Sequence, residues 1–310
     1  MDQQDRPDKQ DPLSEASGVP PEEFPSDDLL SALAGAAGDT EAPQSPACRL
    51  VGVSVVISDE VILEEVSIDF PQNACTVIMG PSGSGKSTLL KTVAGLIVPD
   101  SGHVEILGTK LKNATDRELE HLRSRNGFVF QDDALWQNLT LRQNLTLPLS
   151  YHHPNVGADA VTRRINRLIG ELGGTRRLDL RPASVSAGER KIISFARALI
   201  GDPEILFLDE PTTSVDGERA DLMIRKLKEL KERKITLVAV THNARIASQL
   251  ADFVVVLKAG RVLRFGSLHD ITRTNDPEIE RILTDVLSET ATYDGDILEL
   301  LDPETNTYLT

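Results

Sequence analysis

The sequence predicts an α/β fold with a mostly parallel core sheet, and three observations lead to this prediction. Residues 80–87 read Gly-Pro-Ser-Gly-Ser-Gly-Lys-Ser, which fits the pattern G-x-x-x-x-G-K-[ST] without a gap. The stretch follows a short apolar run at 75–79 and precedes a helical pattern at 88–96, so it joins a buried strand to a helix. Further runs at 204–208 and 235–240 are apolar on both faces, as strands covered by helices on each side require.

The glycine-rich stretch is predicted to bind the phosphates of a nucleotide. Its three glycines let successive backbone N–H groups point at one anion, and a helix beginning near Lys86 adds the positive end of its dipole. Lys86 can reach the β- and γ-phosphates, and the Ser87 hydroxyl can hold Mg²⁺. The residues expected to contact the nucleotide are Gly80, Pro81, Ser82, Gly83, Ser84, Gly85, Lys86, Ser87 and Thr88.

Length, charge and cysteine content restrict the class of protein. The chain has 310 residues, enough for one or two domains with a core. Of its net charge of −15, residues 1–46 and 276–310 carry −9 each, which leaves +3 for 47–275. Acidic ends would be repelled by nucleic acid, so no nucleic-acid partner is expected. Cys48 and Cys75 form neither a disulfide framework nor a zinc motif, which favours a reducing cytosol.

Both ends of the chain are predicted to be acidic extensions. Residues 1–47 have the composition of a disordered tail, and the short segment 26–33 within it either docks on a partner or forms a transient helical turn. In the extension at 276–310, residues 293–310 either fold back on a second copy or stay solvated. No apolar run reaches the roughly 18 residues of a membrane helix, and the acidic start is unlike a signal peptide. We therefore expect a soluble protein that works at a membrane only through partners.

The domain between the tails, predicted at 48–275, opens with an antiparallel β subdomain. Alternating β-branched runs at 51–57 and 61–70 are typical of paired strands that lead into the phosphate-binding strand. A turn at 99–102 and a short strand at 103–108 follow the phosphate-binding helix.

An inserted helical subdomain is expected at about 132–188, after a helix at 117–124 and a buried strand at 127–130. Its clearest helix is the apolar repeat at 161–172. Another helix should run from about 185 to 200. The remaining predicted elements are the strand at 204–208, a charged helix at 220–234, the strand at 235–240 and a hairpin at 253–265.

Four short motifs follow Lys86 in a fixed order: Gln131 at a strand end, then Ser186-Ala187-Gly188-Glu189-Arg190, Asp209-Glu210-Pro211 and His242. Each alone has an ordinary structural interpretation, such as a helix cap for the serine. Together, behind the phosphate-binding loop, they resemble the ATP-binding subunit of ATP-binding cassette (ABC) transporters over about 49–275. The resemblance implies a P-loop NTPase of the ABC ATPase type, with Mg²⁺ and two ATP molecules clasped between two copies, head to tail.

Within one copy, the resemblance implies roles for five residues. Asp209 would bind Mg²⁺ through water, together with Ser87 and Gln131. Glu210 would orient the attacking water, and Gln131 would also contact that water and report ATP to the membrane partner. His242 would bond to the γ-phosphate and hold Glu210. The catalytic set implied in this way is Glu210, His242, Gln131 and Lys86.

Across the dimer, the same resemblance implies that Ser186 and Gly188 donate hydrogen bonds to the other copy's γ-phosphate. The segment 213–216, which ends at Asp216, would cross the dimer and link the two sites. Phosphoryl transfer depends on positioned charges and dipoles, so none of these residues is expected to act covalently.

The chain departs from the family pattern at three positions. Ala187 and Glu189 stand where the family has glycine and glutamine, and either change is expected to slow turnover. No aromatic residue lies between Phe24 and Phe70, so Ile57 or a neighbour takes the place of the adenine-stacking residue. These departures keep open a non-hydrolysing, ATP-gated scaffold, although Lys86, Glu210 and His242 are intact.

Residues 131–149 are similar to the ATPases of Mla- and Mce-type lipid transporters, which implies a lipid substrate and a permease that binds a groove near this segment. A lipid-carrier subunit is a further partner that such systems suggest. The implied location is the cytoplasmic face of the inner membrane, peripheral through the permease. Within the segment, Trp136 is equally well explained as docking surface or as core of the helical subdomain. The alternatives are the ATPase of another ABC system, for lipoprotein release or solute import, and a soluble non-transport ABC protein.

Overall fold

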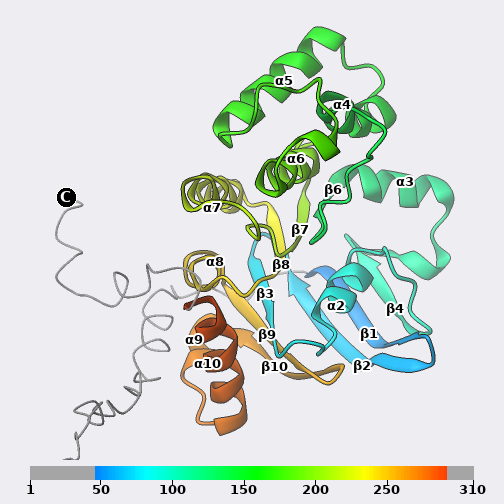
Figure 1. Cartoon of the computed structure of the whole chain (residues 1–310). Helices are drawn as coiled ribbons and strands as arrows, with labels where there is room; N and C mark the ends of the chain where they lie inside the picture. Colours follow the sequence, from blue (N-terminus) through cyan, green and yellow to red (C-terminus); the bar gives the residue numbers. More distant parts are fainter. Residues whose placement is uncertain (1–45, 292–310) are drawn as a thin grey trace, which may run out of the picture.

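The computed structural model describes residues 46–291, which form two β-sheets and surrounding helices (Figure 1). The strands are β1 (Pro46–Ile57), β2 (Glu60–Pro71), β3 (Cys75–Met79), β4 (Ser101–Ile106), β5 (Thr109–Lys110), β6 (Asn126–Val129), β7 (Ile205–Asp209), β8 (Thr236–Val240), β9 (Phe253–Lys258) and β10 (Arg261–Ser267). The α-helices are α2 (Lys86–Val93), α3 (Asp116–Arg125), α4 (Leu141–His152), α5 (Ala158–Glu171), α6 (Ala187–Leu199), α7 (Gly217–Glu232), α8 (Ala244–Leu250), α9 (Leu268–Thr272) and α10 (Pro277–Ala291). The segments predicted at 26–33 and 293–310 lie outside the described residues.

The larger sheet is six-stranded, with the order β10-β9-β3-β8-β7-β6. Its pairs are parallel except for β9 with β10, which are antiparallel. The second sheet, in the order β2-β1-β4-β5, is antiparallel throughout. The predicted fold class, a mostly parallel core sheet with an N-terminal antiparallel β subdomain, is confirmed.

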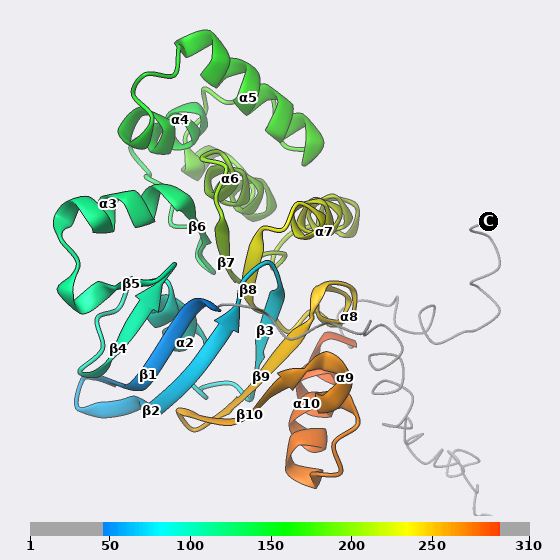
Figure 2. The same cartoon turned by 180° about the vertical axis from the view of Figure 1, so that it is seen from behind.

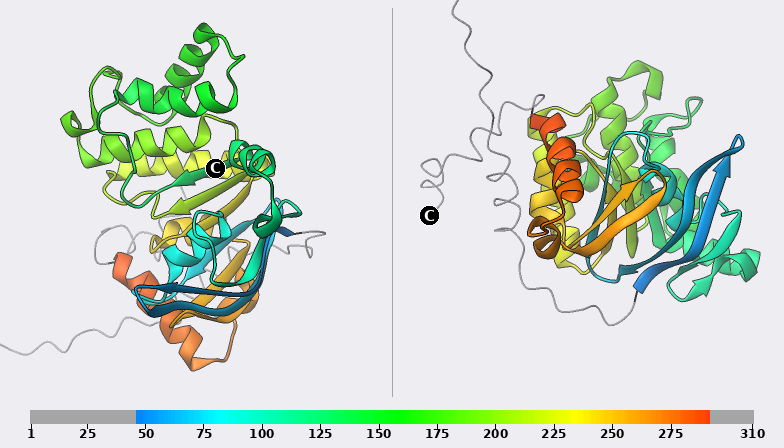
Figure 3. Two further views of the ribbon diagram at one scale, coloured as in Figure 1. Left: turned by 90° about the vertical axis from the view of Figure 1, so that its right-hand side faces the viewer. Right: turned by 90° about the horizontal axis from the view of Figure 1, so that it is seen from below.

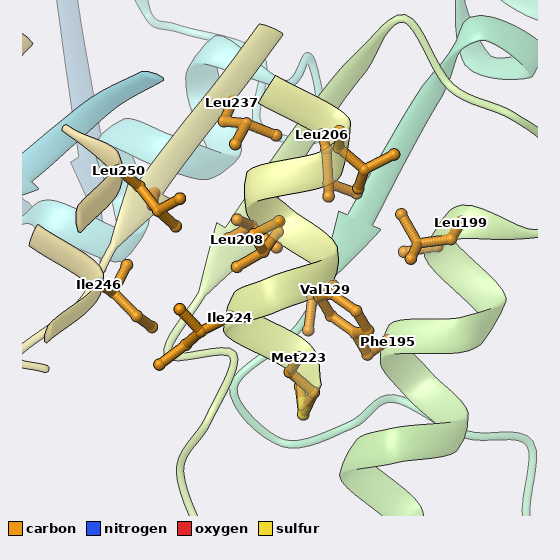
Figure 4. Packing of buried hydrophobic residues seen from close by; sticks show 14 of the residues in the cluster. Val129, Phe195, Leu199, Leu206, Leu208, Met223, Ile224, Leu237, Ile246 and Leu250 are labelled. Atoms are coloured by element: carbon orange, nitrogen blue, oxygen red, sulfur yellow. The ribbon is translucent and has the colours of Figure 1, made fainter. Parts of the chain in front are cut away.

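Alternate side chains of the central strands enter two different hydrophobic cores. Val77 and Met79 of β3 lie in the core that α6, α7 and α8 cover, whereas Ile78 between them lies in the core shared with β1, β2 and α2. Figure 4 shows the first of these cores, where Leu208 of β7 faces Ile224 of α7. Because both faces are covered, all five residues of β3, β7 and β8 are buried.

Helices α4, α5 and α6 pack on one another and form the layer that projects beyond the large sheet (Figures 1 and 2). Two views at right angles show α2 between the two sheets and α10 at the opposite end from α5 (Figure 3). No helix within residues 46–291 combines the length and the apolar character needed to cross a membrane.

Several element boundaries differ from the prediction for local reasons. Strand β4 begins at Ser101, inside the predicted turn, because Gly102 with φ 76° lies against β1, where a Cβ would stand 2.4 Å from the Val51 carbonyl oxygen. Helix α7 begins at Gly217, earlier than expected, because the Asp216 side chain accepts from the Arg219 N–H at 3.0 Å. Helices α8 and α9 were not predicted from the sequence. The predicted hairpin corresponds to β9 and β10, and β9 also pairs in parallel with β3.

The last helix, α10, follows the predicted domain boundary at 275 yet belongs to the main hydrophobic core. Ile279, Ile282, Leu283 and Val286 on one of its faces are buried there. Lys258 at the end of β9 pairs with Glu278 on the same helix. The folded body described here therefore extends through α10, while the predicted boundaries of the domain and tails stay predictions.

Candidate nucleotide-binding and hydrolysis site

The glycine-rich loop connects β3 to α2 in a tight curl that only glycine allows at two points. A Cβ at Gly80 would lie 2.0 Å from the carbonyl oxygen of Leu257 in β9, so the loop backbone packs directly against the neighbouring strand. Gly85 has φ 97° and precedes the first residue of α2, where a Cβ would approach the Ile62 carbonyl oxygen to 2.9 Å. The glycine-rich loop thus lies between β9 and β2, and α2 begins at the end of this loop.

Lys86, the first residue of α2, reaches back into this loop. Its Nζ donates to the carbonyl oxygens of Gly80 at 2.8 Å and of Pro81 at 2.9 Å, and the residue is only 8% exposed. The ammonium is thereby held at the concave side of the loop, where it can exchange carbonyl oxygens for phosphate oxygens.

Ser87 and Asp209 bring two hard oxygen ligands together at the carboxyl end of β7. The Ser87 hydroxyl donates to Asp209 Oδ1 at 2.9 Å, while Asp209 Oδ2 is buried and has no hydrogen-bond partner among the described residues. Burial raises the pKa of Asp209, and the hydrogen bond from Ser87 opposes this shift. A hydroxyl beside a carboxylate with an unsatisfied oxygen fits Mg²⁺, which takes such ligands and would compensate the buried charge.

Glu210 follows in an unusual backbone conformation, with φ 47°, fixed by its N–H donating to the Val240 carbonyl oxygen at 3.0 Å. Its Oε2 accepts from the backbone N–H of His242 at 3.4 Å, and its Oε1 lies 3.5 Å from His242 Nε2. Burial raises the pKa of Glu210 to about 7, and the nearby Asp209 charge adds to the shift. The hydrogen bond from the His242 N–H and, to a smaller extent, the charges of Lys86 and Lys191 oppose it. The carboxyl therefore titrates near neutrality.

An open cavity of about 780 Å³ brings together Lys86, Ser87, Glu210 and His242. It is lined by Ser82, Gly83, Lys86, Ser87, Gln131, Glu210, Thr212, Thr213, Ser214, Val215, Val240, His242 and Asn243. Thr212 and Asn243 were not predicted, and the Asn243 side chain donates to the Thr212 hydroxyl at 3.5 Å. Asn243 also caps α8, because its side chain accepts from the Ile246 N–H at 3.2 Å. An asparagine placed before a helix start was the feature of the sequence that could have pointed to this residue.

Nine predicted site residues of the described chain do not line this cavity. Six of them belong to the adjoining loop, α2 and β7, namely Gly80, Pro81, Ser84, Gly85, Thr88 and Asp209. The other three, Ser186, Gly188 and Asp216, lie at the starts of α6 and α7. Ser186 caps α6, with its Oγ accepting from the Glu189 N–H at 3.2 Å while the Glu189 carboxylate accepts from the Ser186 N–H at 3.2 Å. At Gly188 a Cβ would lie 2.8 Å from the Ser214 carbonyl oxygen, so α6 begins in close contact with the 212–216 loop. Asp216 caps α7. Ser186, Gly188 and Asp216 are therefore not among the residues that line the Lys86 cavity of one copy, although Gly188 contacts Ser214, which does line it.

Two further predicted positions are exposed. Ile57, the last residue of β1, has 46% of its surface exposed, next to the turn at Ser58 and Asp59. Trp136 is 58% exposed, which excludes the interpretation of this side chain as core.

A second hollow, of about 590 Å³, contains Trp136 and lies among α3, β6, α4 and α6. Its apolar lining includes Phe128, Phe130, Leu147, Pro148 and Tyr151, and its basic or titratable lining residues are Arg123, His152, His153 and Arg197. No aspartate or glutamate lines it within residues 46–291. We call this hollow the α3/α4 groove.

Fold and site together define a P-loop nucleoside triphosphatase of the ATP-binding cassette type. The family described as "ABC transporter" matches residues 63–213. The chain is 33% identical over 228 residues to "Methionine import ATP-binding protein MetN" of Bifidobacterium longum, covering 73% of this chain and 56% of the relative. It is 31% identical over 255 residues to "Probable ribonucleotide transport ATP-binding protein mkl" of Mycobacterium leprae, covering 81% of this chain and 72% of the relative.

Among solved structures, a dimeric ATP-binding cassette, MJ0796, captured in a post-hydrolysis state with ADP and Pi, is similar with a TM-score of 0.66 and 31% identity. The match covers 71% of this chain and 98% of that cassette. The chain belongs to the ABC transporter family, whose ATP-binding domains are ATPases, and the predicted enzyme class is confirmed at that level. It spans little more than half the length of the methionine relative.

Proposed function

We propose that this chain hydrolyses ATP as one half of a head-to-tail dimer and so drives transport through a separate membrane permease. The observation that carries the proposal is the 780 Å³ cavity, in which Lys86, Ser87, Glu210 and His242 converge from three different segments. Such convergence of an ammonium, a hydroxyl, a carboxyl and an imidazole suits phosphoryl transfer by positioning and electrostatics.

The site residues of one copy would have different roles in binding and hydrolysis. Lys86 and the loop amides bind the phosphates, and Ser87, Asp209 and Gln131 hold Mg²⁺, which supplies charge neutralisation when bound. Glu210 in its ionised form orients a water molecule, and His242 keeps Glu210 in place through the contacts at 3.4 and 3.5 Å.

A second copy belongs to the proposal because Ser186 and Gly188 are not among the residues that line the Lys86 cavity of their own chain. The solved relative is a dimer of cassettes, which supports a pair of copies that complete each other's sites. In that arrangement the start of α6 would face the partner's γ-phosphate. The contact between Gly188 and the 212–216 loop, which carries Asp216, would link the two sites.

The α3/α4 groove is the place we assign to the permease. Its apolar floor and its arginine and histidine rim, with no acidic lining residue, fit a short helix that carries aromatic or aliphatic side chains and a carboxylate. Docking there would hold the chain at the cytoplasmic face of the membrane.

For the transported molecule we propose a lipid, supported by the similarity of residues 131–149 to Mla- and Mce-type ATPases. A lipid-carrier subunit belongs to the same proposal. Solute import is the second candidate, favoured by the methionine-import relative. Purification of the chain with its partners from native membranes decides between them: recovery with a lipid-binding subunit supports the first, and recovery with a solute permease supports the second.

Hydrolysis is tested on the assembled complex by phosphate release. Wild-type release that Glu210→Gln abolishes supports an ATPase. No release from the wild type would support the ATP-gated scaffold.

A further inference from the structure

One buried lysine, Lys191, makes contacts that the site described so far does not explain. Lys191 lies on α6 and is among the largest fully buried side chains of residues 46–291, with 2% of its side chain exposed. Its Nζ donates to the carbonyl oxygens of Phe130 at 3.0 Å and Gln131 at 2.7 Å and lies 3.1 Å from Asp133 Oδ1. A lysine is rarely buried unless its charge and its donors are compensated, and here two hydrogen bonds and one ion pair compensate them.

The segment that Lys191 holds departs from regular backbone geometry. Asp133 and Ala134 both have positive φ, of 65° and 46°. Two other side chains of α6 fix them, since Ser194 Oγ donates to the Asp133 carbonyl oxygen at 2.8 Å and Arg197 donates to the Ala134 carbonyl oxygen at 2.7 Å. Within the segment from Phe130 to Ala134, four backbone carbonyl oxygens thus accept hydrogen bonds from side chains of one helix.

The same cluster extends to the start of α6. Arg190 lies 3.6 Å from Asp133 Oδ2 and donates to the carbonyl oxygen of Val185, the residue before Ser186. Gln131, which lines the chain's own cavity, and Ser186, which stands apart from that cavity, are therefore connected through a few polar side chains of α6. Within residues 46–291, Lys191 is the residue whose side chain donates a hydrogen bond to the Gln131 carbonyl oxygen, so it is the link nearest to the site.

We propose that Lys191 is a positioning residue that couples the placement of Gln131 in one ATP site to the start of α6, which serves the other site. This inference rests on the proposed two-copy function. A nucleotide-dependent movement of Gln131 would then move the start of α6, and displacement of α6 would move Gln131. Loss of the ammonium leaves the nucleotide pocket of each copy intact but misplaces Gln131 and Ser186 relative to each other.

The test compares Lys191→Met, Lys191→Arg and the double variant Lys191→Met/Asp133→Asn with wild type. Lys228→Met, a change at an exposed lysine of α7, is the control. Trp136, the only tryptophan of the chain, lies five residues after Gln131, and its fluorescence reports on this segment. Thermal melting first establishes that each variant is folded.

For Lys191→Met we expect labelled ATP to bind within about twofold of wild type and KM to change little, while kcat falls on the order of 10- to 100-fold. The response of Trp136 fluorescence to Mg²⁺ and ATP should be lost. Lys191→Arg should recover most of both signals, because it restores a charged donor, and the double variant should not. The Lys228→Met control should match wild type.

Two results would overturn the proposal. One is a folded Lys191→Met protein with wild-type kcat and fluorescence response. The other is full recovery in the double variant, because the ammonium would then serve only to neutralise the buried Asp133. If wild type binds ATP but releases no phosphate, the proposed hydrolytic function fails, and the fluorescence comparison still decides the coupling.

Discussion

Replacing Glu210 by glutamine tests how much the burial of this carboxyl lowers the free energy of unfolding of the nucleotide-free, metal-free protein. Its pKa is raised from an ordinary value of 4.5 to about 7, chiefly by burial. Below pH 4.5 the group is neutral in both the folded and unfolded chain. As the pH rises from 4.5 to about 7, the unfolded chain releases its proton while the folded protein keeps it, so the free energy of unfolding falls. Above pH 7 this loss is complete.

The size of the effect follows from the two pKa values. Their difference, at about 1.4 kcal/mol per pH unit, corresponds to about 3 kcal/mol of lost stability at high pH. Glutamine has nearly the same shape and keeps an oxygen that can accept from the His242 N–H, but it does not titrate. Relative to wild type, Glu210→Gln should therefore gain roughly 2–3 kcal/mol in free energy of unfolding between pH 5 and pH 8.5.

Urea unfolding in the presence of a metal chelator measures this difference at both pH values. The exposed Glu232 on α7 provides the matched control, and Glu232→Gln should change stability little at either pH. A stability difference between Glu210→Gln and wild type that stays constant with pH, within roughly 0.5 kcal/mol, would refute the reasoning that burial suppresses ionisation of Glu210.

Three further predictions concern binding and assembly. Lys86→Ala should abolish retention of labelled ATP in equilibrium dialysis, because the ammonium that fills the loop is lost; undiminished retention would contradict the phosphate-binding role. Gly188→Ala should lower the free energy of unfolding by about 1–3 kcal/mol, because the new Cβ would lie 2.8 Å from the Ser214 carbonyl oxygen. It should also weaken ATP-dependent dimerisation, measured by analytical ultracentrifugation. Gly157→Ala, where a Cβ meets no atom within 4 Å, should leave the dimer unchanged. Trp136→Ala should leave stability within roughly 0.5 kcal/mol but reduce recovery of the permease, and unchanged recovery would remove the α3/α4 groove as its docking place.

The parts of the fold that local sequence determines could be predicted. The strand at 75–79, the glycine-rich loop and the helix after it depend on apolar runs and on glycine geometry, which a short window of sequence contains. Asp209 and Glu210 could be placed at the carboxyl end of a buried strand for the same reason. Their proximity to Ser87 and His242 follows from parallel pairing of β3, β8 and β7, which the apolar character of the strands already indicated.

Other features depend on tertiary contacts that no short window contains. Lys191 lies in a helix whose sequence is amphipathic, and a lysine in such a helix is normally expected on the solvent side. That it is buried follows only from the fold of residues 130–134 around it. Helix α8 was missed because 244–250 is short and of mixed polarity, and its start depends on the Asn243 side chain. The exposure of Trp136 likewise could not be decided until the groove around it was formed.

The position of α10 bears on how this protein can be shortened. A truncation at residue 275, or at the end of the family match at 213, would remove Ile279, Ile282, Leu283 and Val286 from contact with the rest of the core. The apolar surface left behind would face water and favour aggregation during expression. Fragments for biophysical work should accordingly retain the chain through Ala291, the final residue of that helix.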